Sequence, residues 1–117
     1  MTMNSRDVGG VAVVDLIGRM TSDSAGKLSE RVARLLADGH TQLVLNLGQL
    51  NYMDSSGLGE MVACYSKVRK AGGHVRLAET THKIKDLLAI TRLVTVFESY
   101  DTEDLAMASF ASTPAGV

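Results

Sequence analysis

The sequence has 117 residues, of which 45% are hydrophobic, 21% are charged and 4% are aromatic, and its formal net charge is −1. These values are typical of one globular domain with an aliphatic core, and they exclude a disordered chain. No dense basic cluster, signal peptide or membrane-length apolar run is visible, and the one cysteine, Cys64, cannot form an internal disulfide. We therefore expect a cytoplasmic protein without a nucleic-acid or membrane partner.

A β-hairpin is predicted at the start of the chain. Gly9 and Gly10 suit its tight turn, because glycine tolerates positive φ. Residues 11–17 read Val-Ala-Val-Val-Asp-Leu-Ile, and this run of β-branched side chains predicts a strand. Residues 3–8 are expected to pair with it as an edge strand.

Helices and strands alternate along the rest of the chain. Leu28, Val32 and Leu35 recur at helical spacing, and the apolar run at 43–47 fits a parallel strand buried on both faces. In chain order, the predicted elements are a helix over residues 22–38, a strand over 43–47, a helix over 56–70, a strand over 74–77, a helix over 81–90, a strand over 93–97 and a helix over 101–110.

This order predicts an α/β fold, with a mixed, mostly parallel sheet of about five strands, four helices and an opening hairpin. We see no internal repeat and no linker long enough to divide the chain. We therefore expect a single domain over residues 1–117, with its core at about residues 3–110 and a frayed tail at 111–117.

The stretch from Tyr52 to Gly59, between the central strand and the second long helix, carries the most chemistry in the sequence. Ser55 and Ser56 place small hydroxyls where a helix start presents free N–H groups and a partial positive charge. Gly57 and Gly59 each cost about 1 kcal/mol relative to alanine inside a helix. Neither serine is followed three residues later by the Glu or Gln of a capping box. The glycines therefore indicate a helix end kept free of side chains, which another backbone or a bulky ligand can approach closely.

The pattern alone leaves two interpretations of the serines open. In the first, Ser55 accepts a phosphate, which would bring a charge of about −1.5 to −2 to the helix N-terminus and disrupt a protein interface docked over that surface. In the second, Ser55 and Ser56 only cap the helix, and the glycines only permit a turn.

The sequence resembles the STAS family, in particular its anti-sigma factor antagonists. The resemblance rests on the string Met-Asp-Ser-Ser-Gly-Leu-Gly at residues 53–59, with Leu-Asn-Leu at 45–47 before it and Tyr65 and the Gly-Gly pair at 72–73 after it. The register of predicted strands and helices agrees with the family from about residue 8 to residue 110. The resemblance therefore implies the STAS fold over nearly the whole chain.

The resemblance also implies a phosphorylation switch at Ser55, with Ser56 as a secondary acceptor. The kinase would be the partner anti-sigma factor, which uses ATP, and the unphosphorylated antagonist would bind it and so free a sigma factor. A phosphatase acting on phospho-Ser55 would reset the cycle. The partner contacts implied are Met53, Asp54, Ser55, Ser56, Gly57, Leu58, Gly59 and Thr21.

No catalytic, metal or nucleotide chemistry is predicted for the chain itself. The sequence lacks a Gly-x-Ser-x-Gly elbow, and the glycines of the Ser-Ser-Gly-Leu-Gly string are followed by Glu60 rather than the Lys-Ser or Lys-Thr of a phosphate-binding loop. His40, His74 and His82 lack metal-site spacing. We expect no enzyme activity, no cofactor, no metal and a monomer or weak homodimer.

One departure from the family leaves alternatives open. Family members often carry an acidic residue at the start of the first helix, whereas Arg19 and Thr21 stand in that region here. Either the partner is an atypical kinase, or the chain has a different STAS role. Those roles are a non-switching scaffold subunit of a sensory assembly, a transporter-associated STAS protein, and a ligand or nucleotide sensor with a small pocket near Ser55.

Overall fold

A five-stranded mixed sheet forms the centre of the computed structural model, which describes residues 1–111. The strands lie in chain order across the sheet; β1 is antiparallel to β2, and every later neighbour is parallel. The strands are β1 (Thr2–Val8), β2 (Val11–Met20), β3 (Gln42–Met53), β4 (His74–Ala78) and β5 (Glu98–Tyr100). The helices of this range are α1 (Lys27–Ala37), α2 (Ser55–Lys70), α3 (His82–Ile90) and α4 (Glu103–Ala111), with short 3-10 helices η1 (Ser22–Ser24) and η2 (Leu93–Thr95). The predicted α/β fold, opening hairpin and mostly parallel sheet are confirmed.

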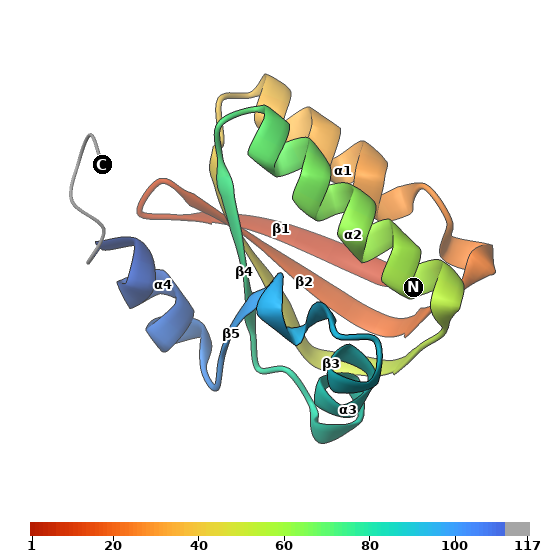
Figure 1. Cartoon of the computed structure of the whole chain (residues 1–117). Helices are drawn as coiled ribbons and strands as arrows, with labels where there is room; N and C mark the ends of the chain where they lie inside the picture. Colours follow the sequence, from red (N-terminus) through yellow and green to blue (C-terminus); the bar gives the residue numbers. More distant parts are fainter. Residues whose placement is uncertain (112–117) are drawn as a thin grey trace.

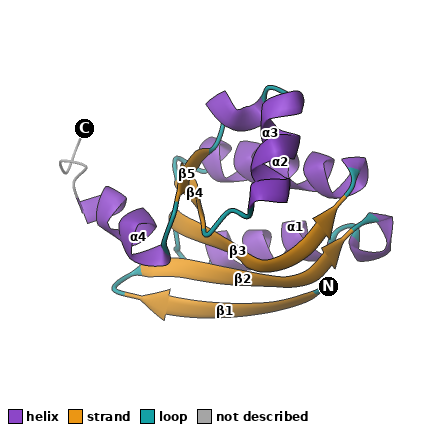
Figure 2. Ribbon diagram, turned by 90° about the horizontal axis from the view of Figure 1, so that it is seen from below, coloured by secondary structure: helices purple, strands orange, loops and turns teal. Residues whose placement is uncertain are grey.

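The two faces of the sheet bury different cores. Helices α1 and α2 run side by side across one face, and α4 lies apart from them on the other face, against β3, β4 and β5 (Figures 1 and 2). Because successive strand residues point to opposite faces, Leu43 and Leu45 join the core under α1 and α2, whereas Val44 joins the smaller core under α4. All three side chains are 0% exposed. The prediction of a central strand buried on both faces is therefore confirmed.

An ion-pair network joins α4 to the opening hairpin. Arg6 on β1 lies 2.9 Å from Asp15 on β2 and 2.6 Å from Glu103 on α4. Asn46 on β3 donates a further hydrogen bond to Glu103 at 3.0 Å. The hydrogen bond from Arg6 holds the pKa of Glu103 below its usual value. The start of α4 is thus fixed directly to β1 and β3, and through Arg6 also to β2.

Two predicted boundaries differ from the structure. The helix expected over residues 22–38 is divided, because Gly26 takes a left-handed φ of 87° and separates η1 from α1. The strand expected over residues 43–47 continues as the longer β3, since two register shifts between β2 and β3 absorb its irregular positions. The predicted frayed tail at 111–117 lies outside the described residues, except for Ala111, which ends α4.

The predicted strand over residues 93–97 is wrong. Arg92 takes a left-handed φ of 63°, and the next three residues form η2, so the strand is displaced to β5. The β-branched run favoured a strand locally, but Phe97 is only 3% exposed and packs edge-to-face on Tyr65 of α2, with ring centroids 5.4 Å apart. Tertiary packing of this aromatic pair accompanies the turn, and such packing overrides local strand preference.

Candidate functional site

The candidate site lies where β2 and β3 leave the sheet side by side. Met20, the last residue of β2, is paired with Met53, the last residue of β3, and the Asp54 amide donates to the Met20 carbonyl oxygen at 3.2 Å. Because these strands are parallel, the segments that follow them emerge at the same edge of the sheet. The structure thus brings Thr21 and Ser55, which were predicted from separate parts of the sequence, to one edge.

The cap of α2 is Asp54. Its Oδ1 accepts a hydrogen bond from the Gly57 amide at 3.0 Å, and Ser55 is the first helical residue. The interpretation of Ser55 and Ser56 as cap residues is therefore wrong, since both lie inside the first turn, where both are exposed. Among residues 1–111, nothing accepts from their amides or bonds to their hydroxyls. The helix start therefore presents two N–H groups and two hydroxyls to its surroundings.

The two glycines of this helix start have different surroundings. A Cβ at Gly57 would lie 2.4 Å from the Met20 carbonyl oxygen and 2.9 Å from Cγ of Met53. The close backbone approach that the sequence indicated thus occurs within the chain at this position, because α2 sits against the end of β2. A Cβ at Gly59 would meet nothing within 4 Å, and the residue is exposed. The fold supplies no reason for glycine at that second position.

Only part of the predicted partner-binding set reaches the surface. Ser55, Ser56 and Gly59 are exposed, and Thr21 and Asp54 are half-buried. The remaining predicted members are buried: Met53, Gly57 and Leu58. Those three shape the surface from beneath, and the assignment of the whole set to partner binding stays a prediction.

Thr21 organises the segment beside the start of α2. Its hydroxyl accepts from the Asp23 amide at 3.3 Å, and its amide donates to the Ser24 hydroxyl at 3.1 Å, which makes a reciprocal capping box for η1. Nearby on β2, the Arg19 guanidinium lies 4.4 Å from the centroid of the Tyr52 ring, within cation–π range. The two residues that stand where acids were expected therefore have structural contacts of their own.

A buried carboxylate that the sequence analysis missed joins α2 to α1. Glu60 is 9% exposed, and its two oxygens accept from the Gly26 and Leu28 amides, each at 2.8 Å. Gly26 provides no side-chain cap, so Glu60 caps α1 from the neighbouring helix. A signal was present in the sequence: Glu60, Cys64 and Val68 recur every four residues on the buried face of α2, where a charged group requires a partner.

The charges along α2 favour an anion at its first turn. That turn holds no acidic residue, and the basic side chains Lys67, Arg69 and Lys70 lie in the last turn, where they complement the helix dipole. In the middle of the helix, Cys64 is 0% exposed, and burial raises its pKa to about 12. Cys64 is therefore a buried thiol whose environment favours its protonated form.

An apolar groove adjoins the site, between the end of β3 and α3. Its volume is 210 Å³. It is lined by Tyr52 and Met53 at the end of β3 and by five side chains of α3, namely Lys83, Ile84, Asp86, Leu87 and Ile90. Ile90 is 79% exposed. The described residues 1–111 contain no group of three or more side chains placed to hold a metal ion. In the same range no helix has the length and apolar character needed to cross a membrane.

Comparisons with known proteins connect the chain to regulators of sigma factors. The model of the STAS domain family matches residues 2–106. The anti-sigma F factor antagonist of Paenibacillus polymyxa is 31% identical over 98 residues, which cover 80% of this chain and 81% of that protein. The anti-sigma-B factor antagonist of Bacillus subtilis strain 168 is 32% identical over 85 residues, which cover 73% of this chain and 77% of that protein.

Solved structures share the same architecture. An anti-sigma factor antagonist from Mycobacterium paratuberculosis superposes with a TM-score of 0.84 at 26% identity, covering 95% of this chain and 94% of that one. The Bacillus cell fate determinant SpoIIAA in its phosphorylated form superposes with a TM-score of 0.72 at 18% identity, covering 93% and 99%. A sulfate transporter family protein from Wolinella succinogenes gives a TM-score of 0.70 at 15% identity, covering 87% and 85%. The last two likenesses show the fold alone.

Proposed function

The chain belongs to the STAS family, and on this basis we propose that it is an anti-sigma factor antagonist switched by phosphorylation at Ser55. In its unphosphorylated form it binds an anti-sigma factor that is also a serine kinase, and so releases a sigma factor. The Paenibacillus and Bacillus relatives are both named as anti-sigma factor antagonists, and these names support the antagonist role. In this scheme the chain holds no cofactor and catalyses nothing; the kinase supplies ATP, and a phosphatase removes the phosphate.

The observation that carries the proposal is the exposed, unpartnered Ser55 hydroxyl in the first turn of α2. During transfer, Ser55 Oγ attacks the γ-phosphorus of ATP and forms the new O–P bond. The bond from that phosphorus to the bridging oxygen breaks, ADP leaves, and the hydroxyl proton passes to a base on the kinase. The Ser55 and Ser56 amides and the positive end of the helix dipole stabilise the phosphate that results.

Phosphate opposes partner binding through charge in this proposal, and the fold stays the same. It adds about −1.5 to −2 charges directly beside Asp54, whose carboxylate already caps α2. A partner seated on this surface would have to desolvate both anions or supply matching cations. The contacts that hold the helix start in place run inward, from Asp54 to Gly57 and from Asp54 to Met20, so they do not depend on the Ser55 hydroxyl.

The scaffold and transporter-associated roles are the competing proposals. The likeness to the Wolinella sulfate transporter family protein means that the fold alone does not separate them from the antagonist role. The exposed Ser55 hydroxyl supports the antagonist role, because phosphate transfer requires an accessible acceptor. Light scattering of the purified chain provides a first check, since a stable particle much larger than a dimer favours the scaffold.

The decisive test is a comparison of baits in a pull-down from cells of the source organism, with partners identified by mass spectrometry. Ser55→Ala should retain an ATP-binding anti-sigma kinase, and Ser55→Asp should lose it. With the purified kinase, Ser55→Asp should weaken binding by roughly a hundredfold, because a fixed negative charge is buried in the interface. Ser66→Asp, at an exposed serine of α2 outside the predicted partner-binding set, is the matched control, and Ser56→Asp tests the secondary acceptor.

Thermal unfolding of every bait should show that the substitutions leave the fold intact. Equal retention of the kinase by Ser55→Ala and Ser55→Asp would contradict the switch at Ser55. Loss of binding with Ser56→Asp alone would move the switch to the second serine.

A further inference from the structure

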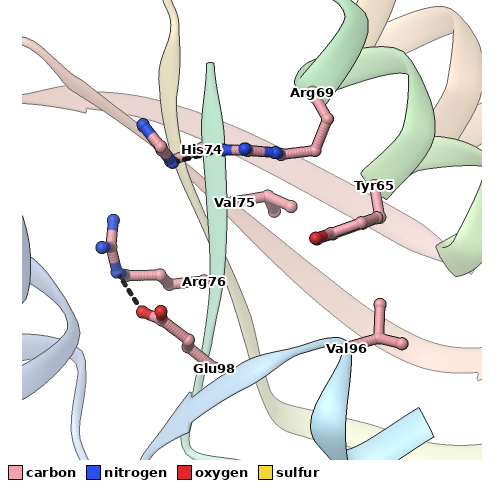
Figure 3. Close-up of a pocket in the computed structure, with 7 residues that line it drawn as sticks. All are labelled: Tyr65, Arg69, His74, Val75, Arg76, Val96 and Glu98. Atoms are coloured by element: carbon pink, nitrogen blue, oxygen red, sulfur yellow. Dashed lines mark hydrogen bonds and ion pairs between the residues drawn. The ribbon is translucent and has the colours of Figure 1, made fainter. Parts of the chain in front are cut away.

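A second polar site lies at the opposite end of α2 from Ser55. β5 pairs with β4 only from Arg76 to Ala78, so within residues 1–111 no strand covers the outer edge of His74 and Val75. A pocket of 280 Å³ opens over this edge, between the end of α2, the start of β4 and the segment that leads into β5 (Figure 3). The antagonist function proposed above makes no use of it.

The polar groups of this pocket are mainly hydrogen-bond donors. Arg69 reaches from α2 across the start of β4, where its Nη1 donates to the Gly73 carbonyl oxygen at 3.2 Å and meets His74 Nδ1 at 2.7 Å (Figure 3). Because a guanidinium can only donate, His74 Nδ1 accepts, and the two contacts hold the Arg69 guanidinium in place. Arg76 adds an Nη1 group that is buried without a hydrogen-bond partner.

Acceptors are scarce on the same walls. Glu98 is the one acid among the described lining residues, and its Oε2 already accepts from Arg76 Nε at 2.8 Å and from the Tyr100 hydroxyl at 3.3 Å. Two guanidinium groups and one carboxylate line the pocket, which leaves one net positive charge. Tyr65 and Val75 add an apolar wall (Figure 3). The missing partner is therefore an acceptor with negative charge.

We propose that this pocket binds a small organic anion whose carboxylate or phosphate group is held by Nε and Nη2 of Arg69, the donors that its contacts with Gly73 and His74 leave free among the described residues. Its volume of 280 Å³ is close to the lower end of small-molecule sites, about 300 Å³, and suits a metabolite-sized ligand better than a peptide. Arg76 keeps its own partners beside the anion, because its Nε donates to Glu98 at 2.8 Å and its guanidinium lies 4.1 Å from the centroid of the Phe110 ring. The ligand's apolar body packs against Tyr65 and Val75.

This pocket is distant from the proposed phosphoacceptor. Ser55 starts α2 and Arg69 lies in its last turn, and fourteen residues at a helical rise of 1.5 Å separate them by about 21 Å. The anion site therefore stands independently of the switch at Ser55. An occupant would link the end of α2 to β4 and stabilise the folded chain in proportion to its concentration.

The test is a set of titrations of the ¹⁵N-labelled chain at pH 7, followed by amide chemical shifts. Sodium phosphate and sodium acetate are the two probes, each compared with sodium chloride at equal ionic strength. We expect saturable shifts confined to residues 69–76 and 96–98, and the stronger of the two probes identifies phosphate or carboxylate as the preferred group.

Three variants make the result specific. Arg69→Gln should weaken binding roughly tenfold or more, because it removes a charge-assisted donor. Lys70→Gln is the matched control, since it removes the same charge from the next residue, which does not line the pocket; it should change the affinity less than about twofold. Glu98→Gln should tighten binding, because it removes the one opposing charge.

Thermal unfolding of each variant guards against a loss of fold. Shifts that fail to saturate, or that spread over all the basic side chains, would overturn the site. Equal weakening by Arg69→Gln and Lys70→Gln would also overturn it, because it would show general charge screening. Ser55→Asp should leave the titration unchanged, so a failed switch and a failed anion site give different results.

Discussion

The two ends of α2 differ in the direction of their contacts. The first turn is tied inward by backbone contacts, with Gly57 against Met20 and the Asp54 side chain on the Gly57 amide, and it leaves hydroxyls and a bare glycine facing outward. The last turn projects long cationic side chains, and Arg69 spans the start of β4. The first turn therefore has an outward surface that makes no contact within the described residues. The last turn has a surface of hydrogen-bond donors, some of which already have partners.

This contrast teaches where a modification can act without unfolding a small domain. A group added at Ser55 changes only the outward surface, since every contact that holds the helix start runs the other way. The comparison makes a testable division: inward contacts of the first turn should matter for stability, and outward positions should matter only for binding. Substitutions along α2 test it, and they are given below from the largest expected effect to the smallest.

Gly57→Ala should have the largest effect. The new Cβ would lie 2.4 Å from the Met20 carbonyl oxygen, a backbone atom that cannot move without disturbing the pairing of β2 and β3. We expect a loss of about 3 kcal/mol in the free energy of unfolding, at the upper end for overpacked sites. Urea unfolding measures it. A loss below about 1 kcal/mol would mean that α2 is not held against β2 as tightly as the structure indicates.

Glu60→Gln should rank next. The carboxylate accepts from two backbone amides of the α1 start, whereas a glutamine oxygen can accept both only poorly and its NH₂ group would face a donor. We expect a loss of about 2 kcal/mol, typical of hydrogen bonds to a charged group, together with faster hydrogen exchange at Leu28. Glu30→Gln, an exposed change on α1, is the matched control. Equal losses in both variants would refute the cap.

The same inward contacts mark the limit of what the sequence could predict. The Gly9-Gly10 turn and the β-branched run after it predicted the hairpin, and the apolar run at 43–47 predicted the buried β3, because each pattern depends on one element at a time. The Glu60 cap and the displaced β5 depend on neighbours distant in sequence, namely the start of α1 and the Tyr65–Phe97 pair. The serine string indicated the site, but only the structure separated the internal role of Gly57 from the open position at Gly59.

Gly59→Ala should act in the opposite direction from Gly57→Ala. The site is open and helical, so alanine should raise the free energy of unfolding by about 0.5 to 1 kcal/mol. If a partner approaches the bare first turn, the same methyl group should weaken binding to the anti-sigma kinase, measured by calorimetry. A variant that is more stable and binds equally well would show that Gly59 lies outside the interface and would confine the outward surface to the two serines.

Arg69→Gln should have the smallest effect on stability, and for that reason it probes the other end of the helix most cleanly. Arg69 is exposed, and its hydrogen bond to the Gly73 carbonyl oxygen at 3.2 Å can be replaced by water. Arg69 also has a favourable position on the helix dipole. We therefore expect a loss of about 0.5 kcal/mol in the free energy of unfolding, close to that of Lys70→Gln. Urea unfolding of the two variants side by side measures the difference. A loss above about 1.5 kcal/mol for Arg69→Gln alone would mean that this end, too, is held by its side chains. The donors over β4 would then be structural contacts, and the contrast between the two ends of α2 would not hold.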